Sequence, residues 1–400
     1  MRFKPLSGIV LAAVILTGCG GGGGGIGGTG SPDPVGPGPG VGTGTLRVSL
    51  TDAPSCGYDA VNISVERVRV HLSSTAVDGD AGWSEIALAP ARRIDLLSLT
   101  NGVLENLGET PLPAGTYTQM RLVLAPNDAS HPLANSVVPT GGSETALTTP
   151  SAQQSGIKLN MNVSVAANKV VDVVLDFDAC KSVVKRGASG KYNLKPVIAV
   201  TPLLTDAGLR VVGYVDPLIA LGSTTISVQS GGVSVKATVP DLTGKFTLYP
   251  VPIGNYDLVL TAAGRVTAVM TGVPVVDTAY TYVNTSSQAF LPPVAAASRA
   301  VIGTVTPATA TVRALQALTG GPTVEVAWAP VDASTGAFDL LLPIDAPIRA
   351  PYALGPAPLI FGADTGAAAK YTLAATSGTA TKTLAINVSA AVPPVIFTFP

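Results

Sequence analysis

The feature that most constrains the fold is a period-two alternation of apolar and polar residues, which recurs in short stretches along the chain. Leu46, Val48 and Leu50 alternate with polar residues, and the stretch from Leu159 to Val165 repeats the pattern. This period places the apolar side chains on one face of a β-strand, whereas a helix needs a period of 3.6. With 44 glycines and 33 prolines among 400 residues, turns are frequent. The sequence therefore predicts an all-β protein.

Two local patterns refine this prediction. The apolar positions are odd at Ile63 and Val65 but even from Val68 onward. One extra residue restores the buried face of a strand, so we predict a β-bulge at Glu66-Arg67. The strongest helix candidate is Val312 to Leu318, although its threonine-rich entry disfavours a helix.

The charge balance excludes one class of function and restricts another. Lys and Arg number 24 against 25 Asp and Glu, and the net charge is −1. A nucleic-acid partner is therefore not expected, because binding the phosphate backbone needs clustered basic residues. The chain has only two histidines, His71 and His131, so histidine-rich metal sites are excluded.

The N-terminus has the pattern of an export signal. Arg2 and Lys4 precede an apolar run from Leu6 to Leu16 that is too short to span a bilayer, followed by Thr17-Gly18-Cys19. Residues 16–19 resemble the lipobox of bacterial lipoproteins. The resemblance implies a signal peptide at 1–18, lipid on Cys19 and, because glycine follows, location at the outer membrane, facing the periplasm or the cell surface. An ordinary secretory signal is the alternative.

Residues 19–44 are predicted to form a disordered tether after the lipidated cysteine. Residues 20–44 read GGGGGGIGGTGSPDPVGPGPGVGTG, which contains nothing that can bury a core. A nucleotide-binding glycine loop would need a strand before it and a helix after it. A flexible glycine-rich chain of this length has a root-mean-square span of roughly 25–30 Å.

Residues 45–205 form the first predicted domain. Its landmarks include Gly44 to Pro54, Val61 to Val70, Gly82-Trp83, Ile94 to Leu99 and Leu112 to Leu122. In this order they resemble the bacterial domain of unknown function 4382, which implies a β-sandwich-like fold and no established activity. The insertion at 127–156 is predicted to be a loop.

Residues 209–292 and 299–400 form two further predicted domains. Thr243-Gly244-Lys245-Phe246 and the turn from Pro252 to Tyr256 resemble the carboxypeptidase-regulatory, transthyretin-like β-sandwich. Thr335-Gly336-Ala337-Phe338 repeats the first motif without the turn, which favours a diverged second copy. Together the domains predict antiparallel β-sandwiches in series, Ig-like or transthyretin-like, after the tether.

Three carboxylates form the candidate metal site. Asp172, Asp176 and Asp178 share one face if this stretch is a strand, and hard oxygen ligands suit Ca²⁺. Asp78 and Asp80 could add ligands from a loop. The alternative is a solvated strand face that the following basic residues neutralise. No other cofactor is predicted.

Catalytic and sugar-binding patterns are sparse. Asp52 and His71 could belong to a triad, but no Gly-x-Ser-x-Gly turn is present, and His71 falls within a predicted strand. His131 lies in a loop without a second histidine. Trp83 and Trp328 are the two tryptophans, which gives a carbohydrate role little support. The chain is therefore not expected to be an enzyme.

The remaining cysteines are predicted to form a disulfide. If lipid consumes the sulfur of Cys19, Cys56 and Cys180 remain in an exported, oxidising setting. Two unpaired buried cysteines are the alternative.

The functional expectation is a non-enzymatic, lipid-anchored cell-envelope protein. It would contact the membrane through Cys19 and present a scaffold or adhesion surface to an unidentified envelope protein or glycan. The alternatives are a Ca²⁺-stabilised ligand- or carbohydrate-binding module and, least favoured, a secreted hydrolase.

Overall fold

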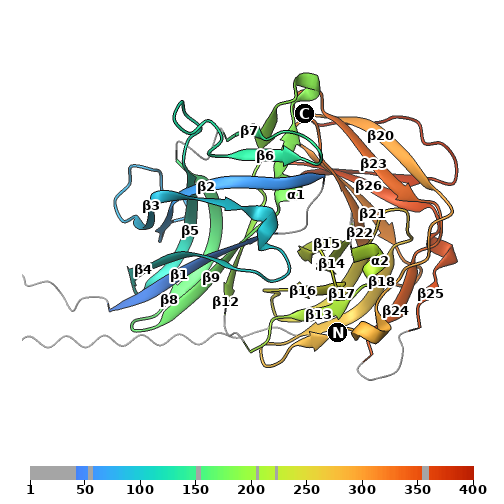
Figure 1. The fold of residues 1–400 in the computed structure, drawn as a ribbon, viewed down its shortest axis with the longest axis horizontal. Helices are drawn as coiled ribbons and strands as arrows, with labels where there is room; N and C mark the ends of the chain where they lie inside the picture. The colour runs from blue at the N-terminus through green and yellow to red at the C-terminus, as the bar shows by residue number, and fades with distance from the viewer. Residues whose placement is uncertain (1–41, 53–56, 150–154, 204–206, 221–223, 354–359) are drawn as a thin grey trace, which may run out of the picture. The chain divides into compact units, whose positions relative to one another are not determined.

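Short strands form nearly all of the regular structure (Figure 1). The computed structural model describes residues 42–52, 57–149, 155–203, 207–220, 224–353 and 360–400. The predicted all-β class is confirmed. The described helical segments are single turns: α1 (Ala179–Ser182), α2 (Pro217–Ala220), η1 (Leu96–Leu99), η2 (Gly187–Ser189), η3 (Ser286–Gln288) and η4 (Thr365–Ala367).

Residues 42–203 form the first sandwich, called sandwich 1. One sheet has the order β12 (Ile198–Leu203), β9 (Val170–Phe177), β1 (Thr43–Asp52), β4 (Glu105–Pro113). The other has the order β10 (Val183–Lys185), β11 (Tyr192–Leu194), β7 (Thr145–Thr148), β6 (Ser136–Pro139), β2 (Tyr58–His71), β5 (Gly115–Leu124), β8 (Ile157–Val165), with β3 (Ser84–Asp95) also paired to β2. Strands β1 and β9 are parallel neighbours.

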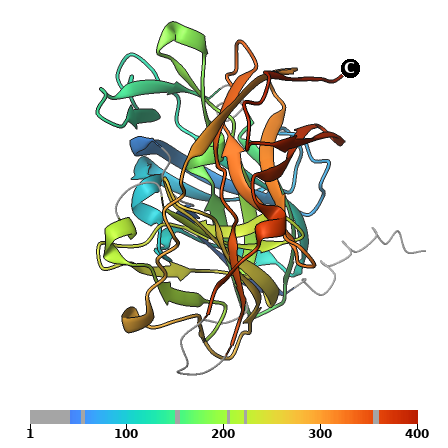
Figure 2. The ribbon, with the colours of Figure 1, turned by 90° about the vertical axis from the view of Figure 1, so that its right-hand side faces the viewer.

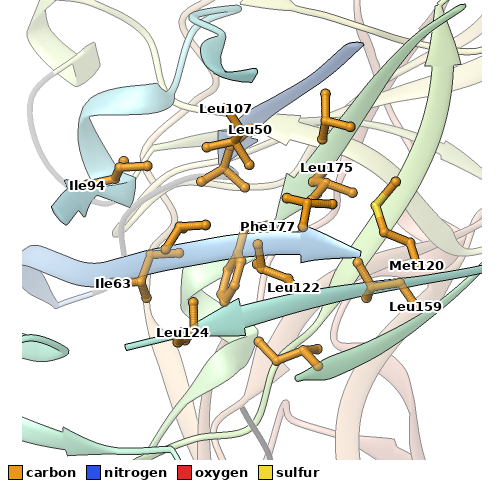
Figure 3. Packing of buried hydrophobic residues seen from close by; sticks show 14 of the residues in the cluster. Leu50, Ile63, Ile94, Leu107, Met120, Leu122, Leu124, Leu159, Leu175 and Phe177 are labelled. Atoms are coloured by element: carbon orange, nitrogen blue, oxygen red, sulfur yellow. The ribbon is translucent and has the colours of Figure 1, made fainter. Parts of the chain in front are cut away.

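The core of sandwich 1 follows from the alternation. Leu50, Leu122 and Phe177 are fully buried and come from three different strands (Figure 3). The predicted β-bulge is confirmed, because the pairing of β2 with both neighbours shifts between Val65 and Arg67.

One local prediction was wrong, and the strongest helix candidate is a strand. The insertion at 127–156 is not a plain loop, because β6 and β7 pair within it and extend the larger sheet. The helix candidate at 312–318 is strand β21 (Thr311–Ala317). There β-branched propensity and neighbouring strands prevail over a short pattern that fitted a helix.

Sandwich 2 begins at residue 207. Its smaller sheet has the order β16 (Lys245–Leu248), β13 (Val211–Tyr214), β19 (Thr281–Tyr282). The larger has the order β15 (Val233–Thr238), β14 (Thr225–Ser230), β17 (Gly254–Thr261), β18 (Ala268–Val275), β24 (Ile348–Pro351), β25 (Gly362–Ala363).

Sandwich 3 uses most of the chain after residue 297. One sheet has the order β23 (Ala337–Pro343), β20 (Ser298–Thr306), β28 (Val395–Thr398). The other has the order β22 (Thr323–Ala329), β21, β26 (Lys370–Ser377), β27 (Ala380–Asn387).

Sandwiches 2 and 3 are joined by strand pairing and by an apolar cluster. Strands β24 and β25 lie between β23 and β26 in sequence, yet β24 pairs in parallel with β18 of sandwich 2 (Figures 1 and 2). A separate apolar cluster joins Val259 and Val269 to Leu318 and Val324, and all four are buried. Because these outward faces are buried against each other, the two sandwiches pack as one body and are not independent domains joined by a linker.

One glycine turn recurs in both sandwiches. Gly244 and Gly336 have φ angles of +83° and +70°, and an added Cβ would lie 2.0 Å and 2.2 Å from the carbonyl oxygens of Val215 and Val305. Only glycine tolerates both the positive φ and the close approach. The same motif therefore has the same local geometry in the two copies.

A tyrosine contact also recurs. The hydroxyls of Tyr117 and Tyr256 donate to the carbonyls of Pro113 and Pro252, four residues earlier. In sandwich 3 the hydroxyl of Tyr371 donates to the carbonyl of Pro343, 28 residues earlier. In sandwich 3 the proline and the tyrosine of this contact are therefore separated in sequence by the segment that contains β24 and β25.

Candidate functional site

Charged side chains from all three sandwiches meet around the end of β9 and helix α1. Asp176, at the end of β9, contacts Lys236 of β15, with 2.5 Å between Oδ1 and Nζ. Their side chains are 12% and 2% exposed. Desolvating two charges is costly, so a buried pair of this kind persists only with close contact between its members.

Lys181 and Glu325 continue the network. Lys181 Nζ lies 3.4 Å from Asp178 and 3.3 Å from Glu325. Arg313 approaches the second oxygen of Glu325 at 3.0 Å. Glu325 therefore bridges a lysine of sandwich 1 and an arginine of its own sandwich.

Gln229 holds the backbone of Glu325 in place. Its side-chain amide donates to the carbonyl of Glu325 at 2.8 Å and accepts from the Glu325 N–H at 2.7 Å. This two-bond contact, together with the ion pairs, places one residue of sandwich 3 against both other sandwiches.

A cavity of about 210 Å³ lies next to the network. Its walls include Tyr58, Asp178, Lys181, Ser227, Glu325 and Trp328. The Lys181 ammonium lies 4.9 Å from the centre of the Trp328 ring, a cation–π distance. The cavity thus combines two aromatic rings, hydroxyl groups and paired charges.

Asp52 is the acid near this network whose pKa is shifted furthest from its usual value. The sequence did not reveal this role. It is 1% exposed, its Oδ1 accepts from the Ala179 N–H, and its Oδ2 is buried without a hydrogen-bond partner. Burial raises its pKa well above the usual range, and Asp178 and Asp176 add to this rise. The Ala179 hydrogen bond and the Lys236 charge oppose it.

The raised pKa predicts a pH-dependent stability. The native state retains the Asp52 proton when the unfolded chain has lost it, so stability falls as pH rises above about 4. The loss is complete above the folded-state pKa. Asp52→Asn should equal the wild type near pH 4 and exceed it at neutral pH.

The measurement is the free energy of unfolding of both proteins across this pH range. Asp339→Asn, which removes an exposed carboxylate from β23, controls for the loss of a surface charge. A difference between wild type and Asp52→Asn that stays constant with pH would contradict the assignment.

The predicted calcium ligands do not converge. Asp172 pairs with Arg47 at 3.3 Å, and Asp176 pairs with Lys236. Asp178 accepts from the Lys181 N–H and caps α1. Within the described ranges, no three His, Cys, Asp or Glu residues are arranged to hold a metal ion. The geometry gives the Ca²⁺ hypothesis no support.

The candidate catalytic residues have structural partners. His71 Nδ1 accepts from the Ser73 N–H, while its Nε2 lies 3.0 Å from the Ala81 carbonyl, and Asp52 bonds elsewhere. His131 is exposed beside Asp128, whose pKa is lowered by the His131 and Ser130 backbone N–H groups. The structure therefore assembles no Asp52–His71 pair.

Trp83 does not form an open sugar platform. The Arg69 and Arg121 guanidinium groups lie 4.6 Å and 4.9 Å from its ring centre. Its indole N–H donates to the Val77 carbonyl. The ring covers two arginines of the sheet, which is a structural role.

The cysteine predictions stay open. Cys180 lies in α1 and lines the cavity together with Tyr58, two residues beyond Cys56 in sequence. Cys56, the signal peptide at 1–18, Cys19 and the tether up to residue 41 lie outside the described residues. The disulfide and the lipid anchor therefore remain predictions.

A comparison with known families finds a match in the first part of the chain. Residues 43–196 match a domain of unknown function, DUF4382. This agrees with the sequence resemblance over 45–205. A search of curated proteins found no match.

Two similar solved structures are interface mutants of a type II cohesin–X-dockerin complex from Acetivibrio cellulolyticus. The N-terminal interface mutant is 23% identical over 22% of this chain and 59% of that chain, with a TM-score of 0.19. The C-terminal interface mutant is 25% identical over 22% and 56%, with a TM-score of 0.17. This chain thus spans little more than half of either. Within the described residues, no helix has the length and apolar character to cross a membrane.

Proposed function

We propose that this protein is a non-enzymatic, lipid-anchored cell-envelope protein whose three packed sandwiches present a protein-binding surface. Support for the anchor comes from Leu16-Thr17-Gly18-Cys19 and the glycine-rich stretch after it. Two acyl chains or more hold a protein stably at a membrane, whereas one exchanges off.

The observation that carries the binding function is an apolar sheet face on sandwich 3. Ile302, Leu341 and Ile396 come from β20, β23 and β28 and are 51%, 66% and 74% exposed. A cavity of about 630 Å³, lined by Ile302, Ile396, Tyr58 and Lys185 among others, adjoins this face. Large apolar side chains exposed together on one sheet face are typical of an interaction site.

The anchor is tested by metabolic labelling with a clickable fatty acid. We expect wild-type protein to carry the label and to sediment with membranes, and Cys19→Ala to lose both properties. Cys56→Ala is the matched control and should keep the label. Labelled Cys19→Ala protein, or unlabelled wild type, would contradict the anchor.

The binding face is tested with a photo-crosslinker in the native envelope. A crosslinker at position 302 should capture a protein, whereas one at position 383 on exposed β27 should not. A glycan adduct at 302 would favour the alternative partner class. No adduct, or equal capture at both positions, would reject the surface.

A further inference from the structure

We propose that Lys236 and Asp176 condense to an intramolecular amide bond that joins β15 of sandwich 2 to β9 of sandwich 1. The inference is independent of the lipid anchor and of the binding face. It rests on a buried ion pair between the two sandwiches, in which Lys236 Nζ lies 2.5 Å from Asp176 Oδ1.

Both reacting groups are held by strands. Asp176 lies on β9 between β1 and β12, opposite Thr51 and Ala199. Lys236 lies on β15 opposite Val228. Well-oriented intramolecular reactions reach effective molarities of roughly 10⁵–10⁸ M, so holding the amine against the acid can replace much of the activation that amide formation normally needs.

Burial favours the uncharged form of the acid. The side chains are 2% and 12% exposed, and burial raises the pKa of Asp176 against the opposing effect of Lys236. Transfer of one proton from the ammonium to the carboxylate leaves a neutral amine beside a neutral acid. Condensation then removes permanently the desolvation cost that two buried charges impose.

Asp52 does not compete for the lysine. Its carboxyl is buried near Asp176 and Lys236, and burial raises its pKa, which favours its neutral form. Asp176 is thus the acid that meets the amine.

The reaction balances without a cofactor. The amine lone pair attacks Cγ of Asp176, so the C–N bond forms and one C–O bond breaks. The departing oxygen takes two of the three protons of the original ammonium and leaves as water. Nothing is oxidised or reduced.

Peptide mass spectrometry of the full wild-type chain tests the bond. After reduction and alkylation, trypsin should release peptide 170–181 joined to 211–245, one water lighter than their sum, with no cleavage after Lys236. Free peptides 170–181 and 211–236 as the dominant products would overturn the proposal. The test needs no variant to fold.

Two matched variants locate the bond. Lys236→Arg keeps the positive charge but lacks the primary amine, so peptide 170–181 should be released free. Lys181→Arg changes the other buried lysine, which pairs with Glu325, and should leave the joined peptide intact. A cross-link that survives Lys236→Arg, or disappears in Lys181→Arg, would overturn the assignment to Lys236.

Discussion

Replacing Cys56 and Cys180 together by serine is expected to lower the free energy of unfolding by about 4–5 kcal/mol. A bridge between positions 56 and 180 would close a long loop and restrict the unfolded chain, and that restriction is lost in the variant. Tyr58, two residues beyond Cys56 in the sequence, lines the same cavity as Cys180.

Chemical denaturation with and without reductant measures this effect. Each single variant should match the double variant, because either one removes the whole bridge, and reductant should bring the wild type to their level. Two thiols that react with maleimide in denatured, unreduced protein would contradict the bridge.

Replacing Glu325 by alanine is expected to destabilise the protein by about 3 kcal/mol. The side chains of Lys181 and Arg313 are only 17% and 20% exposed. The change removes the carboxylate that Arg313 contacts, whereas Lys181 keeps Asp178 at 3.4 Å. Breaking a buried ion pair from one side leaves an uncompensated charge, which costs more than the pair contributes.

Tryptophan fluorescence during denaturation follows this change, because Trp328 lies beside Lys181. Glu105→Ala is the matched control. It removes an exposed partner of Arg92, and we expect a loss below about 1 kcal/mol. If both variants lost the same free energy of unfolding, the Glu325 ion pairs would contribute no more than an exposed ion pair.

Much of the fold of sandwich 1 could be predicted from sequence because its signals are local. The alternation places Leu46, Val48 and Leu50 in the core, and the phase change at residues 65–67 marks the bulge. The hairpin of β6 and β7 escaped prediction because its strands are four residues long and pair with elements far along the chain.

The candidate site was predicted only in part. Asp176 and Asp178 were singled out because strand parity can be read from spacing. Their cationic partners, Lys236 and Lys181, were not identified with them as one network, since Lys236 is 60 residues from Asp176. No local pattern shows which sandwich faces which.

The sequence by itself determined the strands, the turns and the glycines they require, because backbone conformation and side-chain alternation depend on near neighbours. Only the tertiary structure decided that the segment between Pro343 and Tyr371 supplies β24 and β25 to sandwich 2. It also decided that Asp52, Asp176, Lys181, Lys236 and Glu325 belong to one buried region. The physical reason is that packing and desolvation act between surfaces that are far apart in the sequence and meet only when the sandwiches pack against one another.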